Sequence, residues 1–275
     1  MTVIAMTREM GTLGKDVAAE LAEALHMEVV HQELVEHHLA ERLQLGESTV
    51  HRFLEGNASL WERWKIGSDR MSRYTAEEIL ELANKGNVLI RGWGAAQLLR
   101  DVSHVLCVRV CAPMSFRVSV MLERLGLSDE RSMRHEIERN DNGHSRVIQR
   151  QFNADWRRPE NYDIVLNTGF VSVASCVSVI QQLASSPAYK ETPSSRGNLI
   201  DKVIEAEVRK ILDAFAPDTP YGSGIDISVS KGKVVLSGVV GGTGSINGAI
   251  GRIQKIDGVT DIEDNVAFVP VNSGV

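Results

Sequence analysis

The sequence predicts an α/β domain, with a parallel sheet covered by helices on both faces, followed by a smaller α+β domain. Over the first 185 residues, short apolar runs alternate with amphipathic helical patterns. The composition changes at residues 185–198, and beyond them apolar and polar residues alternate about a Lys-Gly turn, as in a β-hairpin. At 275 residues the chain is long enough for two domains, which commonly hold ~100–200 residues each.

Five apolar runs of the first domain predict strands, at residues 2–6, 27–30, 87–92, 104–110 and 162–168. Helical patterns fall between them, at residues 14–26, 32–43, 75–86, 114–126 and 129–150. The third helix has a capping-box start at Thr75 and Glu78 and a glycine stop at Gly86. Strands that alternate with helices in this way favour a parallel sheet.

Residues 185–198 are rich in serine and proline and have no apolar periodicity, which is typical of a linker. The predicted domains are therefore residues 1–184 and residues 199–270. The second domain is expected to contain a helix at 199–215, a hairpin at 224–240, a helix at 245–256 and a closing strand at 258–269.

The composition is that of an ordinary globular protein, with 43% hydrophobic and 24% charged residues. A net charge of −6 gives no general reason to expect nucleic-acid binding. We expect a cytoplasmic protein, because the first residues do not form a secretory signal and no apolar run approaches ~18 residues. Cys107, Cys111 and Cys176 form no CxxC pair, so we interpret them as buried structural thiols.

The stretch "TREMGTLGKD", residues 7–16, lies between the first predicted strand and the first predicted helix. A phosphate-binding loop needs backbone N–H groups that converge on the anion. Gly11 and Gly14 have no Cβ atom to obstruct them, and Lys15 is placed to reach phosphate oxygens. The usual phosphate-loop pattern would have glycine in place of Glu9 and a Mg²⁺-binding hydroxyl in place of Asp16. Asp16 would then either bind the metal or repel phosphate. The alternative is a tight strand–helix turn in which Asp16 favours the helix dipole.

Residues 3–35, 87–126 and 155–168 together resemble the cytidylate kinase-like family of P-loop proteins. That family has a Ser/Thr-Arg-Glu-aromatic-Gly loop. Thr7, Arg8, Glu9, Gly11 and Gly14 match this pattern, with Met10 at the aromatic position. The resemblance covers approximately residues 1–184. It implies a doubly wound, nucleoside monophosphate kinase-like fold and ATP-dependent phosphorylation of CMP or dCMP, with Mg²⁺ required.

The resemblance also implies roles for individual residues. The donor phosphates would be held by Arg8, Gly11, Thr12, Leu13, Gly14, Lys15 and Asp16, with Asp16 also the candidate Mg²⁺ ligand. The predicted catalytic residues are Lys15, Arg117, Arg146 and Arg150. The predicted substrate-binding residues are His31, Arg91, Trp93, Asp141 and His144.

Four positions outside the loop depart from the family pattern. His31 stands where the second strand often ends in Asp, and Trp93 replaces an arginine, although Arg91 lies two residues earlier. Beyond Asp141 the usual lid arginines are replaced by Asn142 and His144. Arg146 and Arg150 are close enough along the helix to substitute for them, and a protonated His144 would partly replace an arginine near or below pH ~6.5.

From residue 199 the chain resembles a BON domain, a small module of many bacterial proteins, through Gly232, Gly238, Gly258 and Asn265. The resemblance implies interaction with a protein partner, a lipid surface or a small ligand, and no chemistry. Together the two matches indicate a bacterial protein.

The stretch between Lys85 and Lys190 contains 12 arginines and no lysine. Arginine binds phosphate through a planar fork, which suits a transition state with charge spread over phosphoryl oxygens. The alternative is a solvated helix surface on which arginines pair with nearby carboxylates. For the cluster Arg117–Arg158 we favour at least one phosphate ligand.

These observations lead to one favoured function and two rivals. The favoured function is phosphoryl transfer from ATP to a nucleoside monophosphate. In the first rival, the domain binds nucleotide without turnover and the BON domain engages a partner, as in an adaptor protein. In the second rival, the domain is a scaffold that binds no nucleotide.

Overall fold

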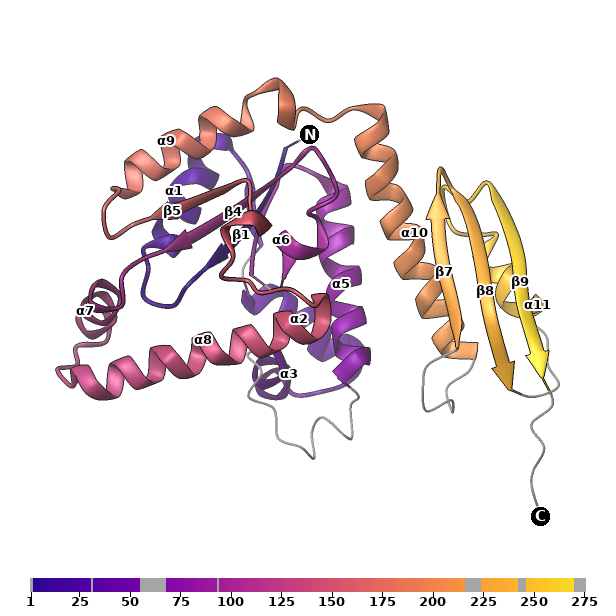
Figure 1. Cartoon of the computed structure of the whole chain (residues 1–275), viewed down its shortest axis with the longest axis horizontal. Helices are drawn as coiled ribbons and strands as arrows, with labels where there is room; N and C mark the ends of the chain where they lie inside the picture. Colours follow the sequence, from indigo (N-terminus) through magenta and orange to yellow (C-terminus); the bar gives the residue numbers. More distant parts are fainter. Residues whose placement is uncertain are drawn as a thin grey trace, which may run out of the picture. The chain divides into compact units, whose positions relative to one another are not determined.

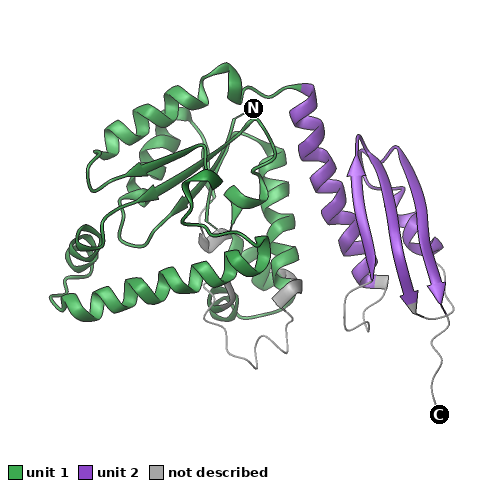
Figure 2. Cartoon of the chain, viewed as in Figure 1, with its two compact units in different colours: residues 1–192 green, residues 193–275 purple. Residues whose placement is uncertain are grey.

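The computed structural model describes residues 2–30, 32–54, 68–92, 94–215, 224–241 and 246–269. The chain divides into two compact units, Met1–Thr192 and Pro193–Val275 (Figure 2). Each unit is described separately below.

A five-stranded parallel sheet forms the centre of unit 1, with strand order β2-β3-β1-β4-β5 (Figure 1). The strands are β1 Val3–Arg8, β2 Glu28–Val30, β3 Val88–Arg91, β4 Val105–Cys111 and β5 Ile164–Asn167. All five strands predicted from the apolar runs are confirmed. From β1 the sheet continues through β3 to β2 on one side and through β4 to β5 on the other, so the loop after β1 lies where the strand order reverses.

Helices cover both faces of this sheet (Figure 1). Their bounds are α1 Gly14–Leu25, α2 Gln32–Leu43, α3 Glu47–Leu54, α5 Ser68–Lys85, α6 Ala95–Leu98, α7 Met114–Leu125, α8 Glu130–Phe152 and α9 Val173–Ala184. Two 3₁₀ turns are η1 Pro159–Asn161 and η2 Pro187–Tyr189. The predicted parallel sheet with two helical layers is therefore confirmed for this unit.

The main core of unit 1 lies between the sheet and the pair α1 and α9. Val17 and Leu21 of α1 and Cys176 and Ile180 of α9 are fully buried against the strands. The central strands are apolar on both faces, which is typical of a parallel sheet between two helical layers.

Two details of the predicted elements are corrected. The third predicted helix begins at Ser68 and not at Thr75, whose hydroxyl instead donates to the carbonyl oxygen of Met71, 2.9 Å away within α5. The glycine stop is confirmed, because α5 ends at Lys85 and Gly86 has φ +72°. Residues 193–198, expected in the linker, form the start of helix α10 Pro193–Phe215, since proline fits the first turn of a helix.

All three cysteines are free. The predicted burial is confirmed for Cys107 and Cys176, whereas Cys111 is only half-buried. Burial raises the pKa of the Cys107 thiol to about 12, which keeps it protonated and unreactive.

Unit 2 packs two helices against a three-stranded sheet of order β7-β8-β9. After α10 come β7 Ile225–Ser230, β8 Lys233–Gly241, α11 Asn247–Ile253 and β9 Asp261–Val269. β7 and β8 form the predicted antiparallel hairpin about Lys231 and Gly232, and β9 joins β8 in parallel. The Asp201 carboxylate of α10 accepts hydrogen bonds from the backbone amides of Lys231 and Gly232, each at 2.8 Å. These bonds connect the helix to the hairpin turn.

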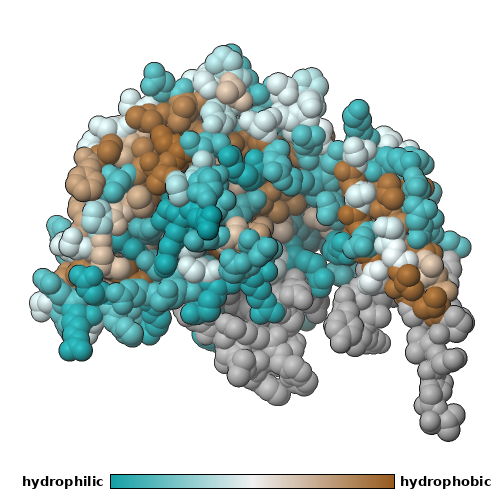
Figure 3. All heavy atoms as spheres, viewed as in Figure 1, coloured by the Kyte–Doolittle hydropathy of each residue, from teal (hydrophilic) through white to brown (hydrophobic). Residues whose placement is uncertain are grey.

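On the face that Figure 3 shows, hydrophilic residues cover the lower part of unit 1 along α8, and apolar patches lie higher up. Exposed large apolar side chains of unit 1 include Leu125, Leu127 and Phe170. Within the described residues, no helix is both long enough and apolar enough to cross a membrane.

The core of unit 1 gives a stability test. Leu106 is fully buried in β4, so Leu106→Ala is expected to lower the free energy of unfolding by about 2–5 kcal/mol, through lost burial and a residual cavity. Val179→Ala, on the outside of α9, is the control and is expected to change it by less than about 1 kcal/mol. Urea unfolding followed by circular dichroism measures both. Equal losses in the two variants would contradict the placement of this core.

Candidate phosphate-binding site

The loop that joins β1 to α1 turns tightly at the carboxyl end of the central strand. The amide of Thr12 donates to the carbonyl oxygen of Glu9 at 3.3 Å, and the Thr12 hydroxyl donates to the same oxygen at 2.9 Å. The Gly14 amide donates to the Thr12 hydroxyl at 3.3 Å, and α1 begins there. The Thr12 side chain is therefore used within the turn.

Both loop glycines are required by close packing. Gly11 has φ +77°, and a Cβ atom there would lie 2.6 Å from the carbonyl oxygen of Arg117. A Cβ at Gly14 would lie 2.9 Å from Cβ of Arg8. These positions fix the loop against α7 and against its own strand, while Leu13 is half-buried between them.

Lys15 and Asp16 occupy the first turn of α1, where backbone N–H groups have no partner inside the helix. The Lys15 side chain is exposed. The Asp16 carboxylate pairs with Arg124 of α7, and both side chains are partly exposed. The first turn therefore offers amides and one ammonium group to an anion, and its carboxylate is shared with a neighbouring helix.

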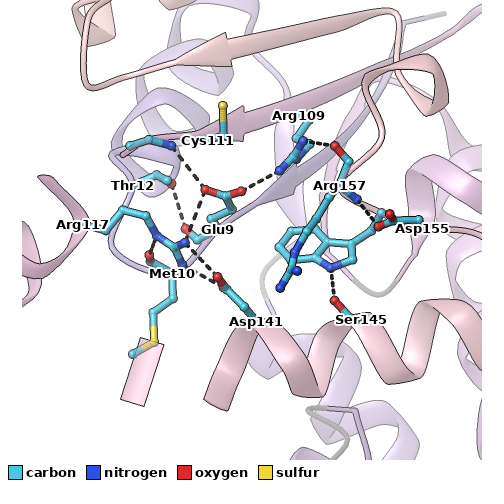
Figure 4. A network of polar contacts seen from close by, with 12 residues as sticks. Glu9, Met10, Thr12, Arg109, Cys111, Arg117, Asp141, Ser145, Asp155 and Arg157 are labelled. Atoms are coloured by element: carbon cyan, nitrogen blue, oxygen red, sulfur yellow. Dashed lines mark hydrogen bonds and ion pairs between the residues drawn. The ribbon is translucent and has the colours of Figure 1, made fainter. Parts of the chain in front are cut away.

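Glu9, which stands where a standard phosphate loop has glycine, is buried beneath the loop (Figure 4). Its carboxylate accepts from Arg109 Nη2 at 2.6 Å and from the Ala112 amide at 3.3 Å, and Arg117 Nη1 lies 3.5 Å away. A buried carboxylate is tolerated when such donors neutralise it. We call Glu9, Arg109, Arg117 and Asp141 the buried ion network.

Arg117 is not placed as a phosphate ligand. Its Nε donates to the Met10 carbonyl oxygen at 2.6 Å, and its two Nη atoms donate to the Asp141 carboxylate, each at 2.8 Å. The Arg117 and Asp141 side chains are only 4% and 9% exposed. The two residues predicted to serve catalysis and substrate binding are therefore paired with each other, and they join the loop to α8.

Arg109 links Glu9 to the segment that follows α8. Its Nη1 donates to the carbonyl oxygen of Arg157, and its guanidinium lies 5.4 Å from the ring centroid of Trp156. Trp156 is fully buried and donates from Nε1 to the Ser145 hydroxyl at 2.7 Å. The residues 153–161 are thus held to both β4 and α8.

His144 does not replace an arginine. Its ring packs edge-on against Trp156 at 4.5 Å between centroids, and no hydrogen-bond partner is present at Nε2. Burial, with a smaller contribution from Arg8 and opposed by Asp141, lowers the pKa of His144 to about 4. The imidazole is therefore neutral at pH 7, because no acceptor compensates the loss of water around the charged form.

The predicted lid arginines lie on the outer side of α8. At about 100° per residue, Arg146 is about 140° around the helix from Asp141, and Arg150 is about 180° from it. Both side chains are exposed, whereas Asp141 and Ile148 face inward. The structure therefore does not bring Arg146 and Arg150 to the loop together with Asp141.

Arg8, Arg91 and Arg109 lie near the carboxyl ends of three neighbouring strands. Arg91 pairs in register with Met6, and Arg109 with Thr7, so the three side chains come from one edge of the sheet. Arg91 is buried and Arg8 half-buried. His31 and Trp93 lie outside the described residues.

The residues present fit a nucleotide phosphate and, less fully, Mg²⁺. A glycine turn, a helix N-terminus and an exposed lysine suit the phosphates of ATP. Within the described residues no group of three His, Cys, Asp or Glu side chains could hold a metal ion. Mg²⁺ commonly uses one or two carboxylates together with phosphates and water, so Asp16 fits it only alongside bound nucleotide.

The sequence interpretation missed the role of Glu9, and it overlooked Arg109 and Trp156 altogether. Glu9 was noted as a mismatch to the standard glycine and as part of the family's loop pattern, but no role was given to its carboxylate. A signal was present in Arg109, because an arginine inside the otherwise apolar run "VLCVRV" must find a buried acceptor.

The pKa of His144 predicts a pH dependence of stability. The folded protein takes up this proton only near pH 4, whereas the unfolded chain takes it up near pH 6.5. The contribution of the neutral His144 to the free energy of unfolding is complete above pH 6.5. It is lost as the pH falls toward 4, which lowers the free energy of unfolding by on the order of 3 kcal/mol. We therefore expect His144→Gln to lose less stability than the wild type between pH 7 and pH 4.5 in urea unfolding.

The control for this test is His135→Gln, which removes an exposed imidazole from the same helix. It is expected to keep the wild-type pH dependence. The same slope in His144→Gln and in the wild type would show that the pKa of His144 is not lowered in the folded protein.

Comparison with known proteins agrees with this geometry. The profile of the cytidylate kinase-like family matches residues 3–169, more than half of the chain and within unit 1. Cytidylate kinases of Pyrobaculum islandicum and Pyrobaculum calidifontis are 24% and 25% identical to it over 179 residues, 65% of this chain and 90% of theirs. An uncharacterized protein from Eubacterium ventriosum shares the fold, with a TM-score of 0.53 at 21% identity over 66% of this chain and 97% of its own. The chain therefore belongs to the cytidylate kinase-like family.

Proposed function

We propose that unit 1 transfers the γ-phosphoryl group of ATP to a nucleoside monophosphate, with Mg²⁺. The observation that carries the proposal is the position of Lys15 and the first turn of α1 at the carboxyl end of the central strand, where the strand order reverses. Ligands of open α/β sheets bind at this place. Membership of the cytidylate kinase-like family supports the same reaction class.

In this reaction a phosphate oxygen of the acceptor forms a bond to the γ-phosphorus, and the bond to the β–γ bridging oxygen breaks, so that ADP leaves. The Lys15 ammonium group and the amides of Lys15 and Asp16 hold and orient the donor phosphates, whereas the amides of Thr12 and Gly14 donate within the turn. Arg8 and Arg91 extend positive charge along the same edge of the sheet. Positioning and charge neutralisation account for most catalysis of this kind, so no covalent intermediate is needed.

We propose CMP or dCMP as acceptor, supported by the two Pyrobaculum relatives, which are named cytidylate kinases. The acceptor would lie on the side of Arg91 and Asp141, between the end of β3 and α8. Asp141 would act there through its pairing with Arg117, and His144 as a neutral packing group. In the structure as described, Arg146 and Arg150 would have to move with α8 to reach the transferred group.

For unit 2 we propose a BON-like role in binding a partner, which is a protein, a lipid surface or a small ligand. The helix–hairpin–helix–strand order supports this reading. The helices cover one face of the sheet, and Val239 and Val269 are exposed on its strands. The reaction would depend on unit 1 alone, since every residue of the phosphate-binding site lies within it.

Removal of the Lys15 ammonium tests the function. Lys15→Met is expected to lower kcat/KM for phosphate transfer from Mg·ATP by about 10²–10³-fold, because a charged donor to the transferred group is lost. The measurement is a coupled assay over CMP, dCMP, UMP, AMP and GMP. Lys85→Met is the matched control, because Lys85 is exposed at the opposite end of the sheet.

The outcomes separate the proposed function from its rivals. Turnover that is selective for one acceptor and lost only in Lys15→Met supports the kinase. ATP binding by calorimetry without turnover, abolished by Lys15→Met, would replace it with a nucleotide-binding adaptor. Neither binding nor turnover would leave the loop as a structural turn.

Asp16 is tested as a Mg²⁺ ligand. Asp16→Asn is expected to raise the Mg²⁺ concentration for half-maximal activity by about tenfold at saturating ATP, because a carboxylate is the ligand that Mg²⁺ prefers. The control is Arg124→Gln, which breaks the same ion pair but leaves the carboxylate in place. An equal shift in both variants would assign the effect to the ion pair between α1 and α7, and not to the metal.

A further inference from the structure

We propose that Glu9 is a positioning residue, which holds the phosphate-binding loop in register with α8 and with residues 153–161 through Arg109 and Arg117. The inference rests on the proposed phosphoryl transfer, because it concerns the geometry of that site. It assigns no contact between Glu9 and substrate. The nucleotide would feel Glu9 only through the loop that Glu9 fixes.

The carboxylate of Glu9 lies between the guanidinium groups of Arg109 and Arg117 (Figure 4). Its side chain is 11% exposed, and its two oxygens are occupied by Arg109, the Ala112 amide and Arg117. A carboxylate directed at the phosphates would repel them. Buried beside two guanidinium groups, it can occupy a glycine position without opposing the anion.

Each arginine that contacts Glu9 continues to a second element. Arg117 binds the Met10 carbonyl oxygen and the Asp141 carboxylate, so it joins the loop to α8. Arg109 binds the Arg157 carbonyl oxygen, so it joins the loop to the segment after α8. Glu9 is the residue that these two connections share.

The loop has little freedom to move independently of this network. The Met10 carbonyl is held by Arg117 Nε at 2.6 Å, and the space where Gly11 would carry a Cβ atom is filled by the Arg117 carbonyl. Lys15 lies one residue beyond Gly14, where α1 begins. A shift of Arg117 would therefore displace the backbone that presents Lys15.

The buried ion network is balanced, with two carboxylates against two guanidinium groups. Neutralising Glu9 leaves two buried cations beside one anion, and Arg109 and Arg117 would then turn toward other acceptors. Misplacement of about 1 Å in a positioning group can cost about 10²-fold in rate. The expected effect therefore falls on kcat more than on KM.

The test compares Glu9→Gln with Glu136→Gln in the full chain. Glu136 is matched in chemistry, because it also pairs with an arginine, Arg139 at 2.8 Å, but on the exposed side of α8. We expect Glu9→Gln to lower kcat at least about 10-fold while KM for the acceptor changes less than about 3-fold. Glu136→Gln is expected to match the wild type. A loss of stability alone would also lower apparent kcat at constant KM, by reducing the active fraction. The kinetics are therefore compared at a temperature at which the melting curve of each variant shows it fully folded.

Arg109→Lys is the second variant, used if Glu9→Gln melts below the assay temperature. It keeps the positive charge, but one ammonium group cannot bind Glu9 and the Arg157 carbonyl while lying against Trp156. We expect the same loss of kcat. A folded Glu9→Gln or Arg109→Lys with kcat within twofold of Glu136→Gln would overturn this inference alone. A wild type without any turnover would overturn the proposed function, and this inference with it.

Discussion

The carboxylate of Glu9 lies buried between Arg109 and Arg117, and the arrangement of the loop, β4, α7 and α8 depends on these contacts. Charged groups buried in this way need partners in good geometry, because each has lost its water. The acceptors and donors come from four separate elements, so their positions are coupled. The shape of the loop consequently depends on the ion pairs beneath it as well as on its glycines.

The fold of unit 1 could be predicted because its signals are local. Buried parallel strands are apolar throughout, and the helices between them carry an apolar stripe, so both periodicities are visible in one sequence. Element ends were harder to predict. Thr75 and Glu78 match a capping box but lie inside α5, and Pro193 looks like part of a linker but starts α10. Such motifs fit more than one position along a helix.

The site was predictable only in part, because its main contacts are distant in sequence. Lys15, Gly11 and Gly14 could be placed from a short stretch that joins a strand to a helix. The pairing of Arg117 with Asp141 spans 24 residues, and that of Glu9 with Arg109 spans 100. An arginine count cannot separate guanidinium groups that bind phosphate from those that neutralise buried carboxylates. The burial of His144, which removes its charge at pH 7, depends on Trp156 packing from another segment.

The buried ion network also explains how the loop tolerates a residue other than glycine at position 9. In a standard loop, glycine leaves the space beneath the phosphate open to backbone alone. Here that space holds a carboxylate whose charge is cancelled by Arg109 and Arg117, so the positive charge at the surface of the loop comes from Lys15 and the first turn of α1. The buried Arg109 and Arg117 hold the loop in shape, whereas the exposed Lys15 is available to a ligand. The buried ion network carries no net charge, so it can hold the loop rigid without changing the attraction of the loop for anions. That attraction is set by other groups, Lys15 and the first turn of α1.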